Sequence, residues 1–208
     1  VYEYRLPTPE ELEAIETVRE SRSHGHAVPS LQASTTAPNR PDNALRVVRQ
    51  RIPDRYRELV NYLANGRWQE ADQETLDVML EVTNQKDQGY FSLESLRNFP
   101  CNDLLLIDRL WLQFSGGKFG FSVQKDLWVE VGGKLDFGED RAAAEEAFEK
   151  MSDRNGWRKD NQYIDYPESV TFDTSAPISH LPMIVCVRGA MAQCRFSSLA
   201  SRIVNCSR

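Results

Sequence analysis

The chain has 208 residues, of which 40% are hydrophobic, and a formal net charge of −6 at pH 7. This length predicts one domain, or one domain with tails, and the apolar fraction is enough to build a core. The acidic balance argues against a nucleic-acid-binding protein, whose affinity comes largely from neutralising phosphates. The sequence has no run of about 18 apolar residues, so we expect no transmembrane helix.

The N-terminal part predicts a short helix over residues 1–20, followed by a flexible linker over residues 21–41. Thr8 can cap the helix, Pro9 suits its first turn, and Glu11 can return to the cap. The linker is rich in Ser, Pro, Ala and Thr, and has almost no large apolar groups. Its two histidines, His24 and His26, have no third ligand nearby, and we interpret them as solvated.

A helical domain is predicted over residues 42–185, and it begins with an antiparallel helix pair. The first helix carries Tyr56, Leu59, Val60 and Leu63 at helical spacing, and Gly66 follows it. The second helix runs from Trp68 to Val82. The segment of residues 84–95 resembles a calcium loop, but Lys86 and Ser95 stand where oxygen ligands are needed, so we exclude that site. A short helix with Leu93, Leu96 and Phe99 is expected next.

The densest apolar run, residues 98–128, is expected to organise the fold. Residues 103–114 predict a helix that is apolar on nearly every face and hence buried, with Asn102 as its cap. Gly116 and Gly117 then favour a turn. Ser122 is expected to cap the following helix, which Gly132 and Gly133 end.

The C-terminal third predicts one further helix, over residues 139–152, with four residues directed inward: Ala143, Ala147, Phe148 and Met151. A loop-like segment containing Trp157 and Tyr163 follows. Residues 169–177 and 180–187 are β-prone and are expected to be extended ends lying on the helical core. Residues 186–208 form a C-terminal extension with a weak amphipathic pattern, for which a mobile tail and a partner-binding segment both remain open.

No catalytic or metal-binding constellation is visible. The four cysteines, at positions 101, 186, 194 and 206, match no zinc pattern. We predict reduced thiols, with a C-terminal disulfide as the alternative. Gly116-Gly117-Lys118 lacks the spacing of a phosphate-binding loop. His180 is predicted to be hydrogen-bonded in the turn before Leu181-Pro182. We therefore expect no enzyme, no catalytic residue and no bound metal.

Aromatic and cationic residues gather in one part of the sequence instead. Phe119, Phe121, Trp157 and Tyr163 lie in or beside expected loops, together with Lys118, Arg154 and Arg158. A loop-built apolar cavity rimmed by cations suits a large flat ligand with anionic edges. The alternative is that these rings are ordinary core.

Five segments, GRWQEADQET, NFPCNDLLLIDRLW, GKFGFSVQKDLW, DRNGWR and APISHLP, resemble the Genomes-uncoupled-four family in that order, over residues 56–182. The resemblance implies an all-helical fold described as a cupped hand, which binds protoporphyrin IX and Mg-protoporphyrin IX. It further implies that the protein stimulates magnesium chelatase by acting with the large porphyrin-binding H subunit of that enzyme, and is not itself an enzyme. The alternative is a helical protein-interaction module in plastid signalling without a porphyrin ligand.

The resemblance also suggests roles for individual residues. The porphyrin faces would lie on Phe119, Phe121, Val123, Trp157 and Tyr163, and the propionates would pair with Lys118, Arg154 or Arg158. The sequence departs from the family pattern at Tyr163, where tryptophan is common, and at Ser179, where glycine is common. The linker and the C-terminal extension suggest a chloroplast protein, in the stroma or at the membrane surface, rather than one of the cyanobacterial cytoplasm.

Overall fold

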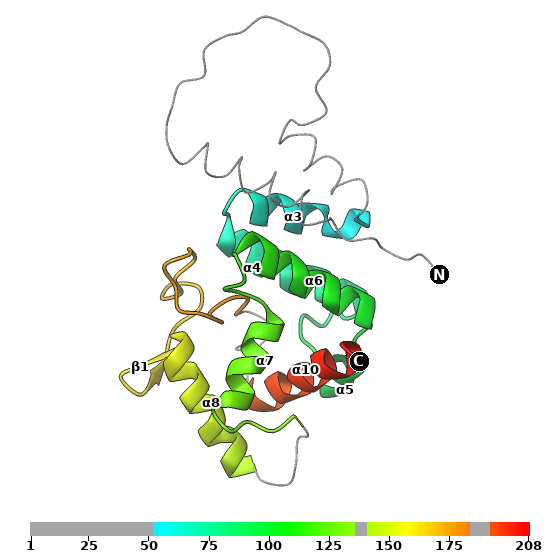
Figure 1. Ribbon diagram of the computed structural model, residues 1–208. Coiled ribbons are helices and arrows are strands. Elements are labelled where there is room, and N and C mark those ends of the chain that lie inside the picture. The colour runs from blue at the N-terminus through cyan, green and yellow to red at the C-terminus, as the bar shows by residue number, and fades with distance from the viewer. Residues whose placement is uncertain (1–51, 136–140, 184–191) are drawn as a thin grey trace, which may run out of the picture.

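The computed structural model describes residues 52–135, 141–183 and 192–208 (Figure 1). The helix and linker predicted over residues 1–41 lie outside this part. The described elements are η1 (Asp54–Tyr56), α3 (Arg57–Ala64), α4 (Trp68–Val82), α5 (Leu93–Arg97), α6 (Cys101–Phe114), α7 (Phe121–Glu130), α8 (Arg141–Asn155), β1 (Arg158–Lys159), β2 (Gln162–Tyr163) and α10 (Ala192–Cys206). The mainly α fold is confirmed, and no described helix is long and apolar enough to cross a membrane.

Helices α3 and α4 form the predicted helix pair along one side of α6 (Figure 1). The side chains of Leu59, Val60 and Leu63 are buried, so the apolar stripe read from the sequence is the face that packs. A hydrogen bond from Trp111 Nε1 to Thr75 Oγ1, 2.9 Å long, joins α6 to α4 inside the core. That bond satisfies two buried polar groups and fixes the register of the two helices.

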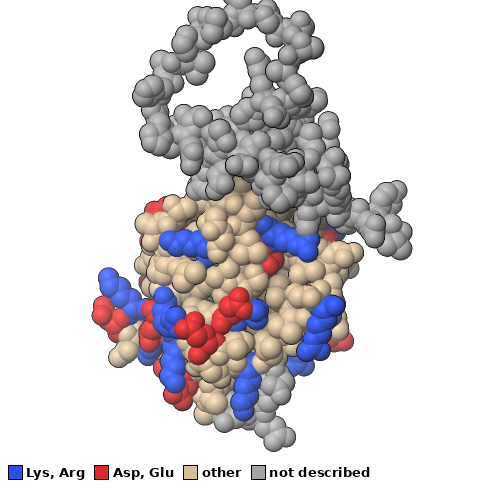
Figure 2. Space-filling model, in the orientation of Figure 1, with Lys and Arg blue, Asp and Glu red and all other residues tan. Residues whose placement is uncertain are grey.

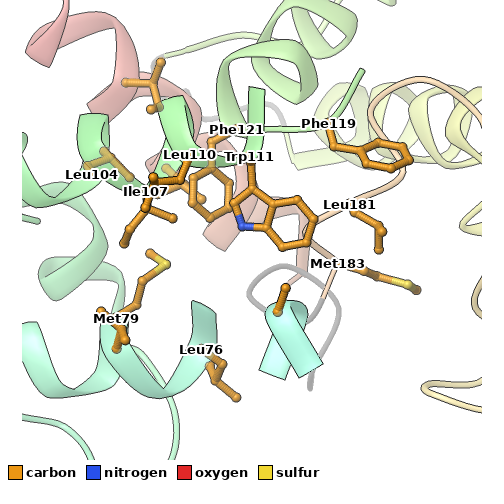
Figure 3. Close-up of a cluster of buried hydrophobic side chains, with 14 of the residues drawn as sticks. Leu76, Met79, Leu104, Ile107, Leu110, Trp111, Phe119, Phe121, Leu181 and Met183 are labelled. Atoms are coloured by element: carbon orange, nitrogen blue, oxygen red, sulfur yellow. The ribbon is translucent and has the colours of Figure 1, made fainter. Parts of the chain in front are cut away.

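Helix α6 is the central element, as its composition predicts. Leu104, Ile107, Leu110 and Trp111 are buried by at least 98%. They project toward Leu76 and Met79 of α4 and toward Phe121 of α7 (Figure 3). Because residues from three helices meet on it, truncation of an α6 side chain would open a cavity that no single neighbour can close.

The predicted caps of α6 and α7 are wrong. Helix α6 begins at Cys101 after Pro100, one residue before Asn102, and no side chain caps it. Helix α7 begins after Gly120. Its N-terminus is capped by a carboxylate from α6, since Asp108 Oδ1 accepts a hydrogen bond from the Ser122 N–H at 2.8 Å. A capping group supplied from 14 residues away leaves no local pattern in the sequence.

Helix α8 and the segment after it form the other side of the molecule. Ala147, Phe148 and Met151 are buried as predicted, but Ala143 is exposed because the inward stripe of α8 begins one turn later. Trp157 is followed by a tight hairpin in which β1 pairs antiparallel with β2. Residues 164–183 have no regular helix or strand and cross back toward α4 and α7.

The C-terminal helix α10 is part of the core. Phe196, Leu199, Ala200 and Ile203 are each 2% exposed. They pack against α5, α6, α7 and α8, which surround this red helix in Figure 1. The sequence left open a mobile tail or a partner-binding segment for the C-terminal extension. Neither possibility describes residues 192–208, which pack in the core.

A disulfide joins Cys101 at the start of α6 to Cys206 at the end of α10. The prediction of reduced thiols is therefore wrong for this pair, and the disulfide is not confined to the C-terminus as the alternative supposed. The two residues are 105 positions apart, and only the packing of α10 brings their Cα atoms to 5.1 Å. Cys194 is free and buried, and Cys186 lies outside the described residues.

Candidate functional site

The turn between α6 and α7 presents the first group of predicted site residues. Ser115 Oγ accepts hydrogen bonds from the backbone N–H groups of Lys118, at 3.1 Å, and Phe119, at 2.9 Å. Gly120 has a φ of 143°, and a Cβ there would lie 2.9 Å from Asp108 Oδ1. Position 120 therefore requires glycine, and the hydrogen bonds to Ser115 fix the backbone that carries the Phe119 ring.

Residues 173–183, here called the covering segment, lie across this turn. The Gly120 N–H donates to Leu181 O and the Ser179 N–H donates to Lys118 O, each at 3.0 Å. Gln124 Nε2, from α7, donates to Pro182 O at 2.8 Å. The connection between the covering segment and the turn is thus made largely of polar contacts, and we call it the seam.

The seam lies between two groups of aromatic rings. In the first, the rings of Phe119 and Trp68 meet edge to face at a centroid distance of 5.7 Å, and Trp68 contacts Trp111 at 5.9 Å. In the second, five rings contact one another: Trp128, Phe148, Trp157, Tyr163 and Phe196. Trp157 Nε1 donates to His180 O at 2.7 Å, so the covering segment is tied to both groups.

The predicted ring contacts are not equally accessible in this structure. Phe119 and Trp157 are 0% exposed and Phe121 is 2% exposed, so these three rings pack as core. Val123 is partly buried, and Tyr163 is 49% exposed on the hairpin. Phe119 and Trp157 therefore offer no accessible face to a flat ligand in this structure.

The three predicted cations differ in their present partners. Arg154 pairs with Glu130 at 2.7 Å, and Arg158 pairs with Asp153 at 3.0 Å. Lys118 Nζ instead donates to the backbone carbonyl of Thr174 at 2.6 Å and lies 5.9 Å from the centroid of the Phe119 ring. Figure 2 shows the same intermingling of basic and acidic side chains near α8 and β1. Lys118 has the partner that an anionic ligand would replace most easily, because a carbonyl carries no full charge.

The sequence-based prediction missed two buried polar residues that hold the candidate site together. Gln124 is fully buried and holds the covering segment, and Asp108 is buried while capping α7. Neither position has a sequence signal, because each acts through backbone groups of a distant segment. His180 agrees with its prediction, because its Nδ1 lies 2.6 Å from Asn155 O in a buried hydrogen bond.

Burial is the main cause of the lowered pKa of His180. The unfolded chain therefore binds a proton more readily than the folded one, and the free energy of unfolding is expected to decrease as pH falls below about 6.5. Denaturant titrations across that range should show a smaller decrease in the His180→Gln variant. The matched control replaces His24 and His26 with Gln. If the pH dependence of the free energy of unfolding were unchanged in His180→Gln but reduced in the control, His180 would not be its cause.

Burial also raises the pKa of the Asp108 carboxyl, against the opposing hydrogen bond from Ser122. The folded state therefore holds the proton more tightly, and this group makes the free energy of unfolding decrease as pH rises from the ordinary aspartate range to the raised pKa. The Asp108→Asn variant keeps the capping oxygen without the charge, so it should flatten this decrease and be at least as stable near neutral pH. The exposed Asp87→Asn change is the control, and a large loss of stability in Asp108→Asn alone would show that the charge is needed.

Comparison with known proteins decides the family. A family model described as GUN4-like matches residues 49–198. The chain belongs to the GUN4-like family. The ligand-free structure of Arabidopsis thaliana GUN4 matches it with a TM-score of 0.56 and 25% identity, over 72% of this chain and 95% of that one. GUN4 from Chlamydomonas reinhardtii, at 24% identity, supports the fold alone, with a TM-score of 0.54 over 82% of this chain and 94% of that one.

Curated relatives of the chain include a cyanobacterial protein and a chloroplastic protein. A Ycf53-like protein of Synechocystis is 33% identical over 138 residues, which are 64% of this chain and 53% of that protein. The chloroplastic tetrapyrrole-binding protein of Arabidopsis thaliana is 29% identical over 135 residues, which are 63% of this chain and 49% of that protein. The aligned part spans about half the length of these two relatives.

Proposed function

We propose that this GUN4-like chain is a porphyrin-binding accessory protein that takes protoporphyrin IX or Mg-protoporphyrin IX at the seam. The observation that carries the proposal is the covering segment, which lies between two aromatic groups and has Lys118 at its edge. A relative named as a tetrapyrrole-binding protein supports the same ligand class. The role is binding rather than catalysis.

Binding begins with movement of the covering segment. Breaking the two backbone hydrogen bonds from Gly120 and Ser179 would uncover Phe119, and releasing Trp157 Nε1 from His180 O would free the second ring. The macrocycle would then replace the covering segment on these rings, and burial of its two faces supplies the favourable free energy. The exposed Tyr163 and Ile178 would extend the apolar surface at the rim.

Lys118 is the preferred partner for a propionate. A propionate at Arg154 would have to displace Glu130, and one at Arg158 would have to displace Asp153 and Glu149. At Lys118 it replaces only a carbonyl oxygen. Val123 and Phe121 would then support the ring from α7.

The proposed cellular role is stimulation of magnesium chelatase in chlorophyll biosynthesis, in the chloroplast stroma and at its membrane surface. The chain would deliver porphyrin to the large H subunit of the chelatase or withdraw product from it. The chloroplastic relative supports a plastid location, and the Synechocystis relative supports a role shared with cyanobacteria.

The test is a titration with deuteroporphyrin IX, a soluble analogue, followed by the Soret band and by tryptophan fluorescence. We expect saturable binding that is weakened about tenfold by Lys118→Ala, the scale of one hydrogen bond to a charged group. Lys86→Ala is the matched control, because Lys86 pairs with Glu81 and lies outside the seam.

Unsaturable quenching that is equal in all three proteins would overturn the proposal. It would favour the other candidate, a helical protein-interaction module in plastid signalling. The observation on its side is the complete burial of Phe119 and Trp157, which is what ordinary core rings show.

A further inference from the structure

We propose that the Cys101–Cys206 disulfide is a redox latch that holds α10 against the second aromatic group and so restricts opening of the porphyrin site. In this account the oxidised protein is the weak porphyrin binder and the reduced protein is the strong one. The inference rests on the proposed function for its ligand, but the movement of α10 can be measured without any ligand.

The latch joins the ends of two helices that are far apart in the sequence. Cys101 is the first residue of α6 and Cys206 is the last of α10. Both are partly exposed, so a reductant can reach the bond from solvent. Arg202 Nε donates to Phe99 O at 2.7 Å beside it, and after reduction this single hydrogen bond, which can break and re-form, is the polar contact that remains between the two ends.

The other end of α10 supports the candidate site. Phe196 lies 5.4 Å from Trp128 and 6.3 Å from Trp157, measured between ring centroids, and the Phe196–Trp157 pair is edge-on. Phe148 contacts Phe196, Trp157 and the rim residue Tyr163. Phe196 therefore packs behind Trp157, the ring that loses its hydrogen bond to His180 O when the covering segment opens.

The chemistry needs an external dithiol. Its thiolate attacks one sulfur of the disulfide and forms a mixed disulfide, while the other cysteine leaves as a thiolate and takes up a proton. The second thiol of the dithiol then attacks the mixed disulfide. Cys101 and Cys206 end as two thiols, having gained two electrons and two protons, and the dithiol ends as a cyclic disulfide.

The latch acts on the population of the open form. With the disulfide intact, α10 is tethered at its C-terminal end, so Phe196 can move outward only by a pivot of the helix about that end. After reduction the helix can shift as a unit, and the open form becomes more populated. Because apparent affinity is proportional to the population of the binding-competent form, reduction should strengthen porphyrin binding.

The experiment compares oxidised protein, protein reduced by dithiothreitol, and the Cys206→Ser variant, with Cys194→Ser as a control that keeps the disulfide. Hydrogen exchange without ligand reports on α10, and helical circular dichroism verifies that each form is folded. Titration with deuteroporphyrin IX then gives the affinity. Cys101→Ser is a second way to remove the bond if Cys206→Ser fails to fold.

In reduced protein and in Cys206→Ser, we expect faster hydrogen exchange in α10 but not in α4. In the same two forms, we expect the affinity for deuteroporphyrin IX to increase by about fivefold or more. Cys194→Ser should behave as oxidised protein until dithiothreitol is added. Equal affinity in oxidised and reduced protein that both bind porphyrin would overturn the latch and leave the proposed function intact. If exchange in α10 became faster but neither form bound porphyrin saturably, the proposed function would be overturned. The proposal that the disulfide controls porphyrin binding would be overturned with it.

Discussion

Loss of the Cys101–Cys206 disulfide is expected to lower the free energy of unfolding by about 4–5 kcal/mol. The bond closes a loop with a sequence separation of 105, so its main effect is to restrict the unfolded chain, which gains conformational freedom when the bond is removed. Denaturant titration of Cys206→Ser against the oxidised parent measures the difference. The helical spectrum should change little, because the buried side chains of Phe196, Leu199 and Ile203 keep α10 on the core in most molecules after the bond is lost.

Cys194→Ser separates the disulfide from a general effect of replacing a cysteine in α10. Cys194 is free and buried, so this change should cost much less than Cys206→Ser. Addition of a dithiol should bring the parent down to the stability of Cys206→Ser and leave that variant unchanged. Equal stability of parent and Cys206→Ser under oxidising conditions would mean that the bond does not form in solution.

The Phe119→Ala variant is expected to lose about 3–5 kcal/mol of stability, the range for truncating a buried phenylalanine. Phe119 is 0% exposed and contacts Trp68 edge-on at 5.7 Å, so its removal leaves a cavity under the covering segment. Thermal and denaturant unfolding measure this loss. In protein that remains folded, deuteroporphyrin affinity should fall about tenfold or more, because a ring that supports the ligand is absent. Phe121→Ala should act in the same direction.

Phe99→Ala is the matched control for this prediction. Phe99 is also 0% exposed, but it precedes α6 beside the end of α10, away from the seam. The two variants should lose similar stability, and only Phe119→Ala should lose porphyrin affinity. Equal affinity in both folded variants would remove Phe119 from the binding site and leave it with a purely structural role.

The helices could be predicted because each carries its apolar stripe within a few consecutive residues. The stripes of α3, α4 and α6 are local patterns, and Gly116 and Gly117 mark the turn that separates α6 from α7. The helix caps and the disulfide between helices could not be predicted in the same way. Asp108 reaches an amide 14 residues away, and Cys101 reaches a partner 105 residues away, so both depend on the completed fold.

The candidate site could be predicted only in its composition. The sequence shows that aromatic residues and cations gather around Phe119 and Trp157, but not that both rings are closed over by residues 173–183. It also does not show that Arg154 pairs with Glu130, since that carboxylate lies on α7 and not on the helix of Arg154. The place of α10 in the core could not be predicted because its buried face includes two serines, Ser197 and Ser198, and because the space that it fills is formed by four other helices.

The most direct test of porphyrin binding at the seam is hydrogen exchange at the Gly120 and Ser179 amides, measured by NMR with and without saturating deuteroporphyrin IX. These amides donate to Leu181 O and Lys118 O across the seam. The account predicts that their exchange changes on binding while amides in α4 keep their rates. Unchanged exchange at both amides in protein that demonstrably holds the porphyrin would contradict it and place the ligand elsewhere.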